Sequence, residues 1–263
     1  MRSLRIHCFA LSFLLLPLLV LGAYAGTISL GTAGSYAVLA GSTVTNTGPS
    51  VIYKGDVGVS PGTAITGFPP GIVNAPGTIH SADAAAAQAQ LDLTTAYITA
   101  AGLAYTTDLT GQDLGGMTLT PGVYFFKTSA QLTGALTLDN STNQNAVFIF
   151  QIGTTLTTAS FSYVGFLNGI DPNVFWQVGT SATLGTSTAF AGNILALDSV
   201  TLNTTATIDC GSALARNGAV TLDNNDITSC GSSETTVPEP GTLGLLGSGL
   251  AILAGVARRR MRI

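Results

Sequence analysis

Charged side chains are scarce in this 263-residue chain: Asp, Glu, Lys and Arg make up 8% of it, against about 25% in an average soluble protein. Between Gly26 and Val237 the basic residues are Lys54, Lys127 and Arg216, against twelve acidic residues, which gives this segment a net charge of −9. Nucleic-acid binding depends on clustered Lys and Arg that neutralise phosphates. The composition therefore excludes that class of function. It also means that Thr, Ser, Asn and Gln must provide the solubility of the segment.

The first residues contain the three parts of a secretory signal. Basic Arg2 and Arg5 precede an apolar run from Phe9 to Leu21, and Ala23-Tyr24-Ala25 follows it. A membrane anchor is the alternative, but about 13 apolar residues are too few to span a bilayer core of ~30 Å. We predict a signal peptide over residues 1–25, cleaved before Gly26.

The other end contains Pro238-Glu239-Pro240, an apolar stretch over residues 241–257, and Arg258-Arg259-Arg260. The arginines should stay on the cytoplasmic side of the inner membrane, with the preceding domain outside. This order of features resembles the PEP-CTERM sorting tail of Gram-negative bacteria, which implies processing by an exosortase-like sorting protease after a transient stay in the membrane. A permanent anchor is the alternative, although the Gly-rich stretch is a marginal span. We expect residues 233–263 to be a linker and this tail, with a single hydrophobic helix over 241–257.

Cysteine and histidine are rare. Without the signal peptide, only Cys210, Cys230 and His80 remain, too few for a zinc site, which takes about four ligands. We therefore predict no metal and no cofactor. An exported protein matures in an oxidising setting, so a disulfide between Cys210 and Cys230 is favoured over two free thiols.

One segment of the remaining domain, residues 26–232, is typical of a helix. Residues 82–104 contain no proline and are rich in Ala, Gln and Leu, with Ser81 available as a cap and Asp83 in the first turn. Apolar or small residues recur there at steps of three and four, at Ala84, Ala87, Leu91, Thr94, Ile98, Ala101 and Tyr105. We expect this stripe to pack closely against a flat partner.

The rest of the domain consists of short β-branched runs broken by Gly, Asn and Asp. A Thr-Leu step recurs at Thr155, Thr183, Thr201 and Thr221, and the last two intervals are 18 and 20 residues. Repeats of about 20 residues, each too small to bury its own apolar face, favour the stacked coils of a β-solenoid. A β-sandwich also contains many short strands, but the recurring Thr-Leu motif favours the solenoid.

The predicted strands are of two kinds. Those at 148–152, 174–178 and 194–197 are apolar nearly throughout, so we expect both of their faces to be covered, with the helix on that side. In the second kind, small polar residues alternate before a bulky apolar residue, which is Phe161, Phe190 or Ile208.

If those bulky residues point inward, the alternation sets an outward ladder. Its polar members are Thr158, Ser160, Ser187, Thr205 and Thr207. In this register Thr186 and Thr188 face inward, but a one-residue shift at the corner would expose them instead of Ser187, so they remain candidates. Stacked coils would turn the ladder into a flat array of methyl and hydroxyl groups.

Several short sequence motifs of the domain resemble those of the widespread microbial ice-binding protein family. They occur in the family's order at residues 30–39 (LGTAGSYAVL), 46–49 (NTGP), 55–62 (GDVGVSPG), 119–124 (LTPGVY) and 175–178 (FWQV). The resemblance covers about residues 30–228. It implies an irregular right-handed β-solenoid (β-helix) of triangular section with one long α-helix packed alongside. It also implies adsorption to ice through one flat face, without cofactor or catalysis.

Some members of that family carry a Thr-(Ala or Gly)-x-(Thr or Asn) pattern. Residues 63–66 (TAIT) fit it literally, which makes Thr63 and Thr66 a second candidate for the ice-binding face. Neighbouring coils lie ~4.8 Å apart and alternate outward residues on one strand ~6.7 Å apart, so outward threonines form a two-dimensional grid that can order water.

We therefore expect a secreted, antifreeze-like protein whose partners are ice, the sorting protease and an extracellular polysaccharide. A structural or adhesive role in the extracellular matrix is the alternative function. Catalysis is not expected, because the acids are scattered and His80 and Arg216 have no catalytic partner in the pattern.

Overall fold

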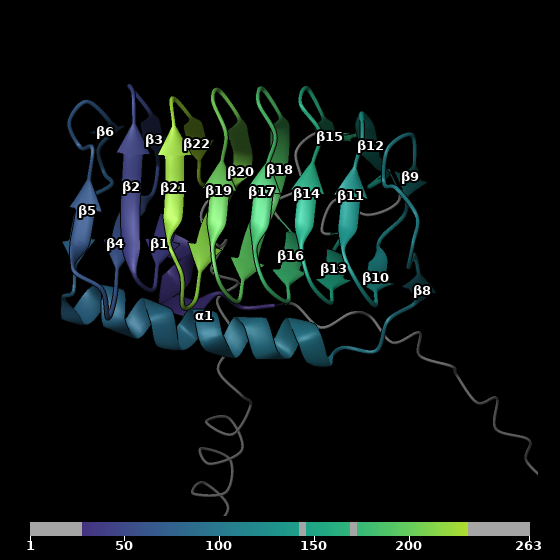
Figure 1. Cartoon of the computed structure of the whole chain (residues 1–263). Helices are drawn as coiled ribbons and strands as arrows, with labels where there is room; N and C mark the ends of the chain where they lie inside the picture. Colours follow the sequence, from purple (N-terminus) through teal and green to yellow (C-terminus); the bar gives the residue numbers. More distant parts are fainter. Residues whose placement is uncertain (1–27, 142–145, 169–172, 231–263) are drawn as a thin grey trace, which may run out of the picture.

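The computed structural model describes residues 28–141, 146–168 and 173–230, and its short strands stack side by side with one long helix along the stack (Figure 1). Every pair of neighbouring strands is parallel. The expected β-solenoid with a helix alongside is therefore confirmed, and the β-sandwich is wrong. The predicted signal peptide and the tail with its helix over 241–257 lie outside the described residues.

The strands form three columns, one on each side of the solenoid. The first column contains β8 (Thr107–Asp108), β10 (Gly122–Phe126), β13 (Phe148–Ile152), β16 (Val174–Val178), the second halves of β18 (Ala189–Ala196) and β20 (Thr207–Ala215), β1 (Tyr36–Ala40), β4 (Asp56–Val59) and β7 (Ile79–Ser81). The second column is a separate seven-stranded sheet of β11 (Ala130–Leu132), β14 (Leu156–Thr158), β17 (Ala182–Leu184), β19 (Val200–Leu202), β21 (Val220–Asp223), β2 (Thr43–Thr47) and β5 (Ala64–Thr66). The third contains β9 (Thr118–Leu119), β12 (Ala135–Leu138), β15 (Tyr163–Phe166), the first halves of β18 and β20, β22 (Asp226–Thr228), β3 (Val51–Tyr53) and β6 (Ile72–Val73).

The order of the strands shows that the N-terminal coil lies against the C-terminal coil. After a short 3-10 helix, η1 (Gly31–Ser35), β1 pairs with β20 on one side and with β4 on the other. In the same way β2 lies between β21 and β5, and β3 between β22 and β6. The chain thus begins in the second layer from one end, adds the end layer with β4 to β7, and then continues from the opposite end with β8.

Helix α1 (Ala84–Gly102) makes the return between the two ends (Figure 1). Its 19 residues span ~28 Å at ~1.5 Å per residue. Seven stacked strands are separated by six intervals of ~4.8 Å, which gives ~29 Å. The helix is therefore about as long as the seven-stranded second column. It packs on the first column, whose nine strands span ~38 Å and so extend beyond it.

The start of the helix differs slightly from the prediction. Asp83, rather than Ser81, is the cap, and its carboxylate accepts a hydrogen bond of 2.8 Å from the N–H of Ala86. The Ser81 hydroxyl instead donates to the carbonyl of Thr63. Among the described residues, no helix combines the length and apolarity needed to cross a membrane.

The face of the helix that packs on the sheet is not the predicted stripe. The buried residues are Ala86, Ala89, Leu93, Ala96 and Ala100. Leu91 and Ile98 of the predicted stripe are 64% and 61% exposed. Alanines occur around most of the helix, so the 3.6-residue period fits two phases about equally well. A distant contact selects the phase: Asp92 accepts hydrogen bonds of 2.8 and 2.7 Å from the N–H and hydroxyl of Thr32, which turns Leu93 toward the sheet.

Two apolar clusters hold the layers together. One lies between the helix and the first column, where Leu93 and its neighbouring alanines contact strand residues such as Ile149 and Leu195. The other fills the solenoid and contains an aromatic stack of Tyr124, Phe150, Trp176 and Phe190, with ring centroids 5.4, 3.9 and 4.9 Å apart. The apolar strands are thus covered on both faces, as the sequence predicts.

The predicted disulfide joins Cys210 to Cys230, beyond the last strand β22. Cys210 lies within β20, so the bond closes a 20-residue loop around the final coil. Such a loop restricts the unfolded chain and contributes about 3 kcal/mol. The bond therefore holds the coil against which the N-terminal coil packs.

The burial pattern of the helix predicts a large difference between two leucines. Leu93→Ala should lower the free energy of unfolding by about 3 kcal/mol, because it leaves a cavity between helix and sheet. Leu91→Ala should change it by less than about 0.5 kcal/mol, because that side chain is exposed. Urea unfolding followed by circular dichroism measures both, and the reverse ranking would favour the predicted stripe over the observed one.

Candidate functional site

The seven-stranded sheet carries a continuous row of threonines on its outer surface. The threonine row consists of Thr157, Thr183, Thr201, Thr221, Thr45 and Thr66, each directly paired with the next in the strand register. All six are exposed or partly exposed, whereas the strand residues on either side of them, such as Val200 and Leu202, point into the core. Six positions spaced ~4.8 Å apart make a row ~24 Å long.

A second row of small residues runs beside the threonine row, two positions earlier in each coil, at the start of the strand or just before it. The small-residue row consists of Thr155, Ser181, Ser199, Ala219, Thr43 and Ala64. Some of its hydroxyls fix the spacing of the coils, since Ser181 and Ser199 each accept a hydrogen bond from a backbone N–H of the next coil, at 3.2 and 3.1 Å. Neither row contains a charged residue. The two rows are therefore regular and uncharged, and the one acid within the strands of this sheet, Asp223, lies two positions after Thr221 at the end of β21.

The predicted ladder does not form one surface. Thr158 and Thr188 are 3% and 0% exposed, and their hydroxyls lie 2.8 Å apart inside the solenoid, so neither can contact a ligand. Ser160, Thr186, Ser187 and Thr205 lie in the turns after the seven-stranded sheet, and Thr207 lies in the third column. The prediction that Thr158 points outward is therefore wrong, whereas Thr188 is inward as the alternation required.

The ladder fails because of the backbone at one corner of the solenoid. Phe161, Ser187, Thr205 and Asn224 have positive φ angles of 61°, 57°, 61° and 54° and lie at the same corner of successive coils. A left-handed residue turns the chain and changes which side the following residues face. Phe161, which the prediction placed in the core, is consequently 76% exposed.

The second candidate lies partly on the right surface. Thr66 is the end of the threonine row, while Thr63 precedes β5 and is exposed at the edge of the last coil. The remaining members of the row were missed as site residues, although Thr183, Thr201 and Thr221 belong to the recurring Thr-Leu step. The Thr-Leu step at Thr155 would assign the wrong residue to the row, because Thr157 and not Thr155 pairs with Thr183. The repeat was thus a signal for the site as well as for the fold.

The other two columns offer no comparable surface. The helix covers the first column. The third column carries bulky side chains, among them Tyr53, Ile72 and Tyr163 at 39%, 52% and 52% exposure, and the exposed acids Asp209 and Asp226. A flat crystal plane cannot approach such an uneven and charged surface as closely as it can approach the threonine row.

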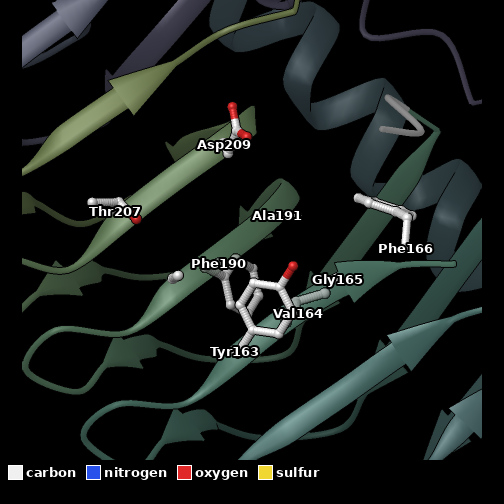
Figure 2. Close-up of a pocket in the computed structure, with 9 residues that line it drawn as sticks. Tyr163, Val164, Gly165, Phe166, Phe190, Ala191, Thr207 and Asp209 are labelled. Carbon is white, nitrogen blue, oxygen red and sulfur yellow. The ribbon is translucent and has the colours of Figure 1, made fainter. Parts of the chain in front are cut away.

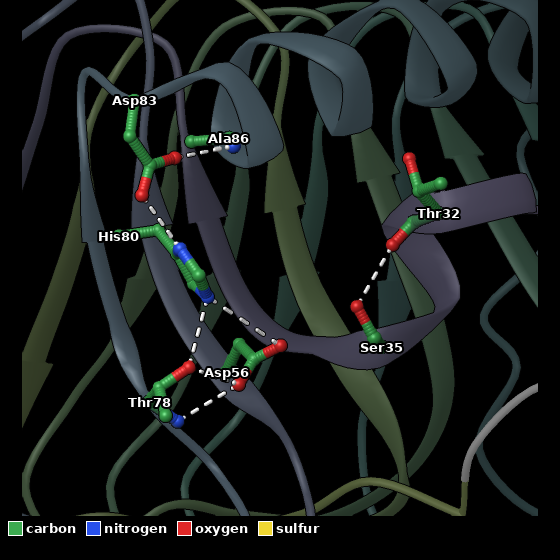
Figure 3. Close-up of polar contacts among 7 residues, drawn as sticks. All are labelled: Thr32, Ser35, Asp56, Thr78, His80, Asp83 and Ala86. Carbon is green, nitrogen blue, oxygen red and sulfur yellow. Dashed lines mark hydrogen bonds and ion pairs between the residues drawn. The ribbon is translucent and has the colours of Figure 1, made fainter.

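One cluster of acid–base groups lies where the helix begins (Figure 3). His80 Nδ1 lies 2.7 Å from Asp83 Oδ2, and His80 Nε2 lies 2.8 Å from the Thr78 hydroxyl, which is also 3.0 Å from Asp56 Oδ1. The order carboxylate, imidazole, hydroxyl is that of a nucleophilic triad. Here the hydroxyl is shared with Asp56, which also accepts the N–H of Thr78 at 2.8 Å. The cluster therefore ties the helix start to the coil that precedes it.

Hydrogen bonds hold several aspartates in their charged form. The N–H of Ala86 and the ring of His80 lower the pKa of Asp83. Burial alone would raise the pKa of Asp92 and of Asp113. Hydrogen bonds from Thr32 and Gln88 outweigh burial at Asp92, so its pKa is lowered. Hydrogen bonds from Thr133 and Gly115 do the same at Asp113. Among the described residues, no group of three or more His, Cys, Asp or Glu is arranged to hold a metal ion.

Comparison with known proteins identifies related sequences. The Ice-binding-like family matches residues 38–228, and the PEP-CTERM protein-sorting motif matches residues 236–261. A protein of Nostoc sp. (strain HG1) named "Ice-binding protein" is 58% identical over 246 residues, which cover 91% of this chain and 90% of the relative.

Solved structures show the same fold. An ice-binding protein from an Antarctic biological consortium is 46% identical with a TM-score of 0.75, over 79% of this chain and 93% of the other. An ice-binding protein from the Antarctic ascomycete Antarctomyces psychrotrophicus is 42% identical with a TM-score of 0.75, over 79% of this chain and the whole of the other.

The lowered pKa values of Asp83, Asp92 and Asp113 predict acid sensitivity. A carboxyl whose pKa is lower in the folded state adds stability above its unfolded value of about 3.9, and this stability is lost as the pH falls below that value. The melting temperature should therefore hold steady down to about pH 5 and decrease between about pH 4 and pH 2. Asp92→Ala should lower it at pH 7 and make the decrease shallower. Asp226→Ala, which removes no hydrogen bond among the described residues, should do neither, and an equal effect of both would contradict the assignment.

Proposed function

We propose that this chain, which belongs to the Ice-binding-like family, adsorbs to ice through the threonine row and the small-residue row of its seven-stranded sheet. The observation that carries the proposal is the strand register, which places six threonines side by side on six neighbouring strands. Every named relative and structural neighbour given above is an ice-binding protein.

The chemistry of the two rows suits an ordered layer of water. Threonine hydroxyls bind water molecules, and the methyl groups between them limit the positions that those molecules can take. The rows repeat at ~4.8 Å along the stack and at ~6.7 Å along each strand, so the water is held on a regular grid. A charged group would impose its own hydration shell, and neither row has one. The layer can then merge with a growing crystal plane.

We infer a binding function rather than a catalytic one. The named relatives are ice-binding proteins, and the Thr78 hydroxyl, the one nucleophile in the His80 cluster, is hydrogen-bonded to Asp56. A structural or adhesive role in the extracellular matrix, with a polysaccharide as partner, is the second candidate. The sorting motif at residues 236–261 supports this role, because an exported and sorted protein would meet the extracellular matrix.

For localisation we propose export from a Gram-negative cell in three steps. The signal peptide over residues 1–25 directs the chain across the inner membrane. The apolar stretch over 241–257 and Arg258 to Arg260 then hold it there transiently, with the domain outside. An exosortase-like protease finally acts near Pro238 to Pro240 and releases the domain of residues 26–232 with its linker.

Two substitutions in the threonine row test the ice-binding face. Thr183→Tyr and Thr201→Tyr should each abolish ice shaping and thermal hysteresis, because one bulky ring holds the flat surface away from the crystal. The free energy of unfolding should change by less than about 0.5 kcal/mol, since both side chains point outward. Crystal morphology and nanolitre osmometry provide the readouts.

Thr118→Tyr in the third column is the matched control and should leave ice shaping intact. Thr205→Tyr, at the corner, tests the predicted ladder and should also have little effect. If Thr205→Tyr abolishes activity while Thr183→Tyr does not, the corner and not the sheet is the face. If the wild-type protein does not shape ice, the matrix role becomes the leading candidate.

Mass spectrometry of protein released from cells tests the processing. We expect a mature chain that starts at Gly26 and ends near Pro238 to Pro240. Release of mainly full-length chains that still carry Arg258 to Arg260 would contradict the sorting proposal, whereas a cleaved start with an uncleaved, membrane-bound tail would indicate a permanent anchor.

A further inference from the structure

The third column contains a hollow of about 380 Å³ between β15 and β20 (Figure 2). It forms where two strands separate. β12 and β15 pair at four positions, whereas β15 and β18 pair only at Tyr163 and Ala189. β18 then turns toward the helix side and pairs with β16 from Asn193 onward. The hollow therefore lies on a different side of the solenoid from the threonine row.

One wall of the hollow is an exposed aromatic ring. A Cβ placed at Gly165 would overlap the ring of Tyr163, so the absence of a side chain at Gly165 lets the ring pack against it. Tyr163 is 52% exposed, so part of its ring is open to solvent. The ring thus presents a flat apolar platform at the edge of the hollow.

Small side chains form the floor of the hollow, and polar side chains form the wall opposite Tyr163. Ala189 and Ala191 lie on the strand next to Tyr163, and their partners on the following strand are Thr207 and Asp209. The strands of Tyr163 and Asp209 are two intervals apart, or ~9.6 Å. Two alanines thus leave a gap between an aromatic ring on one side and a hydroxyl and a carboxylate on the other.

The carboxylate in this wall is free to bind a ligand. Asp209 accepts no hydrogen bond and forms no ion pair among the described residues, unlike Asp56, Asp83 or Asp92. Its position is fixed, because the next residue, Cys210, is joined to Cys230 by the disulfide. The Asp209 carboxylate therefore has a fixed position and can still accept hydrogen bonds from a ligand.

We propose that this hollow binds one hexose unit of a neutral polysaccharide. The C–H face of a pyranose ring stacks on an exposed aromatic ring. The hydroxyl groups of the sugar can donate hydrogen bonds to the Asp209 carboxylate, and they can donate to or accept from the Thr207 hydroxyl. The gap of two strand intervals accommodates a single sugar ring. No residue that lines the hollow is basic, and Asp209 would repel a uronic acid, so the sugar is uncharged.

This site is independent of the proposed ice-binding face. The two surfaces belong to different columns, so one domain can contact ice and a polysaccharide at the same time. Loss of one activity should leave the other unchanged, which makes the two proposals separable by experiment.

The test is a nuclear magnetic resonance titration of the ¹⁵N-labelled secreted protein with cellotriose, maltotriose and mannotriose, and with trigalacturonic acid as the charged probe. At least one neutral trisaccharide should shift the amide signals of Tyr163, Ala191 and Asp209. Tyr163→Ala and Asp209→Asn should each weaken that association about two- to tenfold or more, the range expected for one stacking or one charge-assisted contact. Ala191→Leu, which fills the gap, should also weaken it.

Tyr53→Ala and Asp226→Asn are the matched controls, because they remove an exposed tyrosine and an exposed acid from the same column outside the hollow. They should leave saccharide binding unchanged, and all five variants should still shape ice if they are folded and if the threonine row is the ice-binding face. Circular dichroism confirms folding independently of ice. The proposal is overturned if no neutral trisaccharide shifts these signals, if trigalacturonic acid binds equally well, or if the controls weaken binding as much as the variants of the hollow.

Discussion

The packing of the N-terminal coil against the C-terminal coil is the contact on which the rest of the structure depends. β1, β2 and β3 lie between the last strands of the chain and the strands that follow them in sequence. After completing two layers at one end, the chain must therefore return to the opposite end. A helix of 19 residues covers the ~29 Å of seven stacked strands, so its length is set by the number of coils. The helix that makes this return also buries the first column.

The same contact assembles the threonine row. Thr45 and Thr66 come from the N-terminal layers and the other four threonines from the C-terminal half, so the row crosses the junction between Thr45 and Thr221, whose hydroxyls lie 3.4 Å apart. A shift of one residue there would turn Thr45 inward and Val44 outward. Two contacts hold the register: Ser50 accepts the N–H of Asn225 at 2.9 Å, and the disulfide closes the final coil. The regularity of the surface thus follows from the stability of the fold.

The sequence predicts those parts of the structure that local patterns determine. The helix is found within two residues at each end, and the fully apolar strands coincide with those under the helix. What it does not predict depends on distant partners. The rotation of the helix is set by Asp92 and Thr32, which are 60 residues apart, and the threonine row joins Thr45 to a residue 176 positions later. The ladder failed for a local reason: left-handed corners occur at Ser187 and Thr205, residue types that give little sign of that conformation.

The positions of the acids explain how the threonine row and the small-residue row stay free of charge. Asp56, Asp83, Asp92, Asp108, Asp113 and Asp139 each accept a hydrogen bond from a backbone N–H. All six N–H groups belong to turns, strand ends or helix starts, where the regular ladder does not supply a partner. Carboxylates are suited to these places because the charged acceptor makes the bond stronger. Most acids are thus required where a coil bends or the helix begins. Among the strands of the seven-stranded sheet, whose N–H groups are already paired, only β21 carries an acid, Asp223 at its end, and the two rows carry hydroxyl and methyl groups alone.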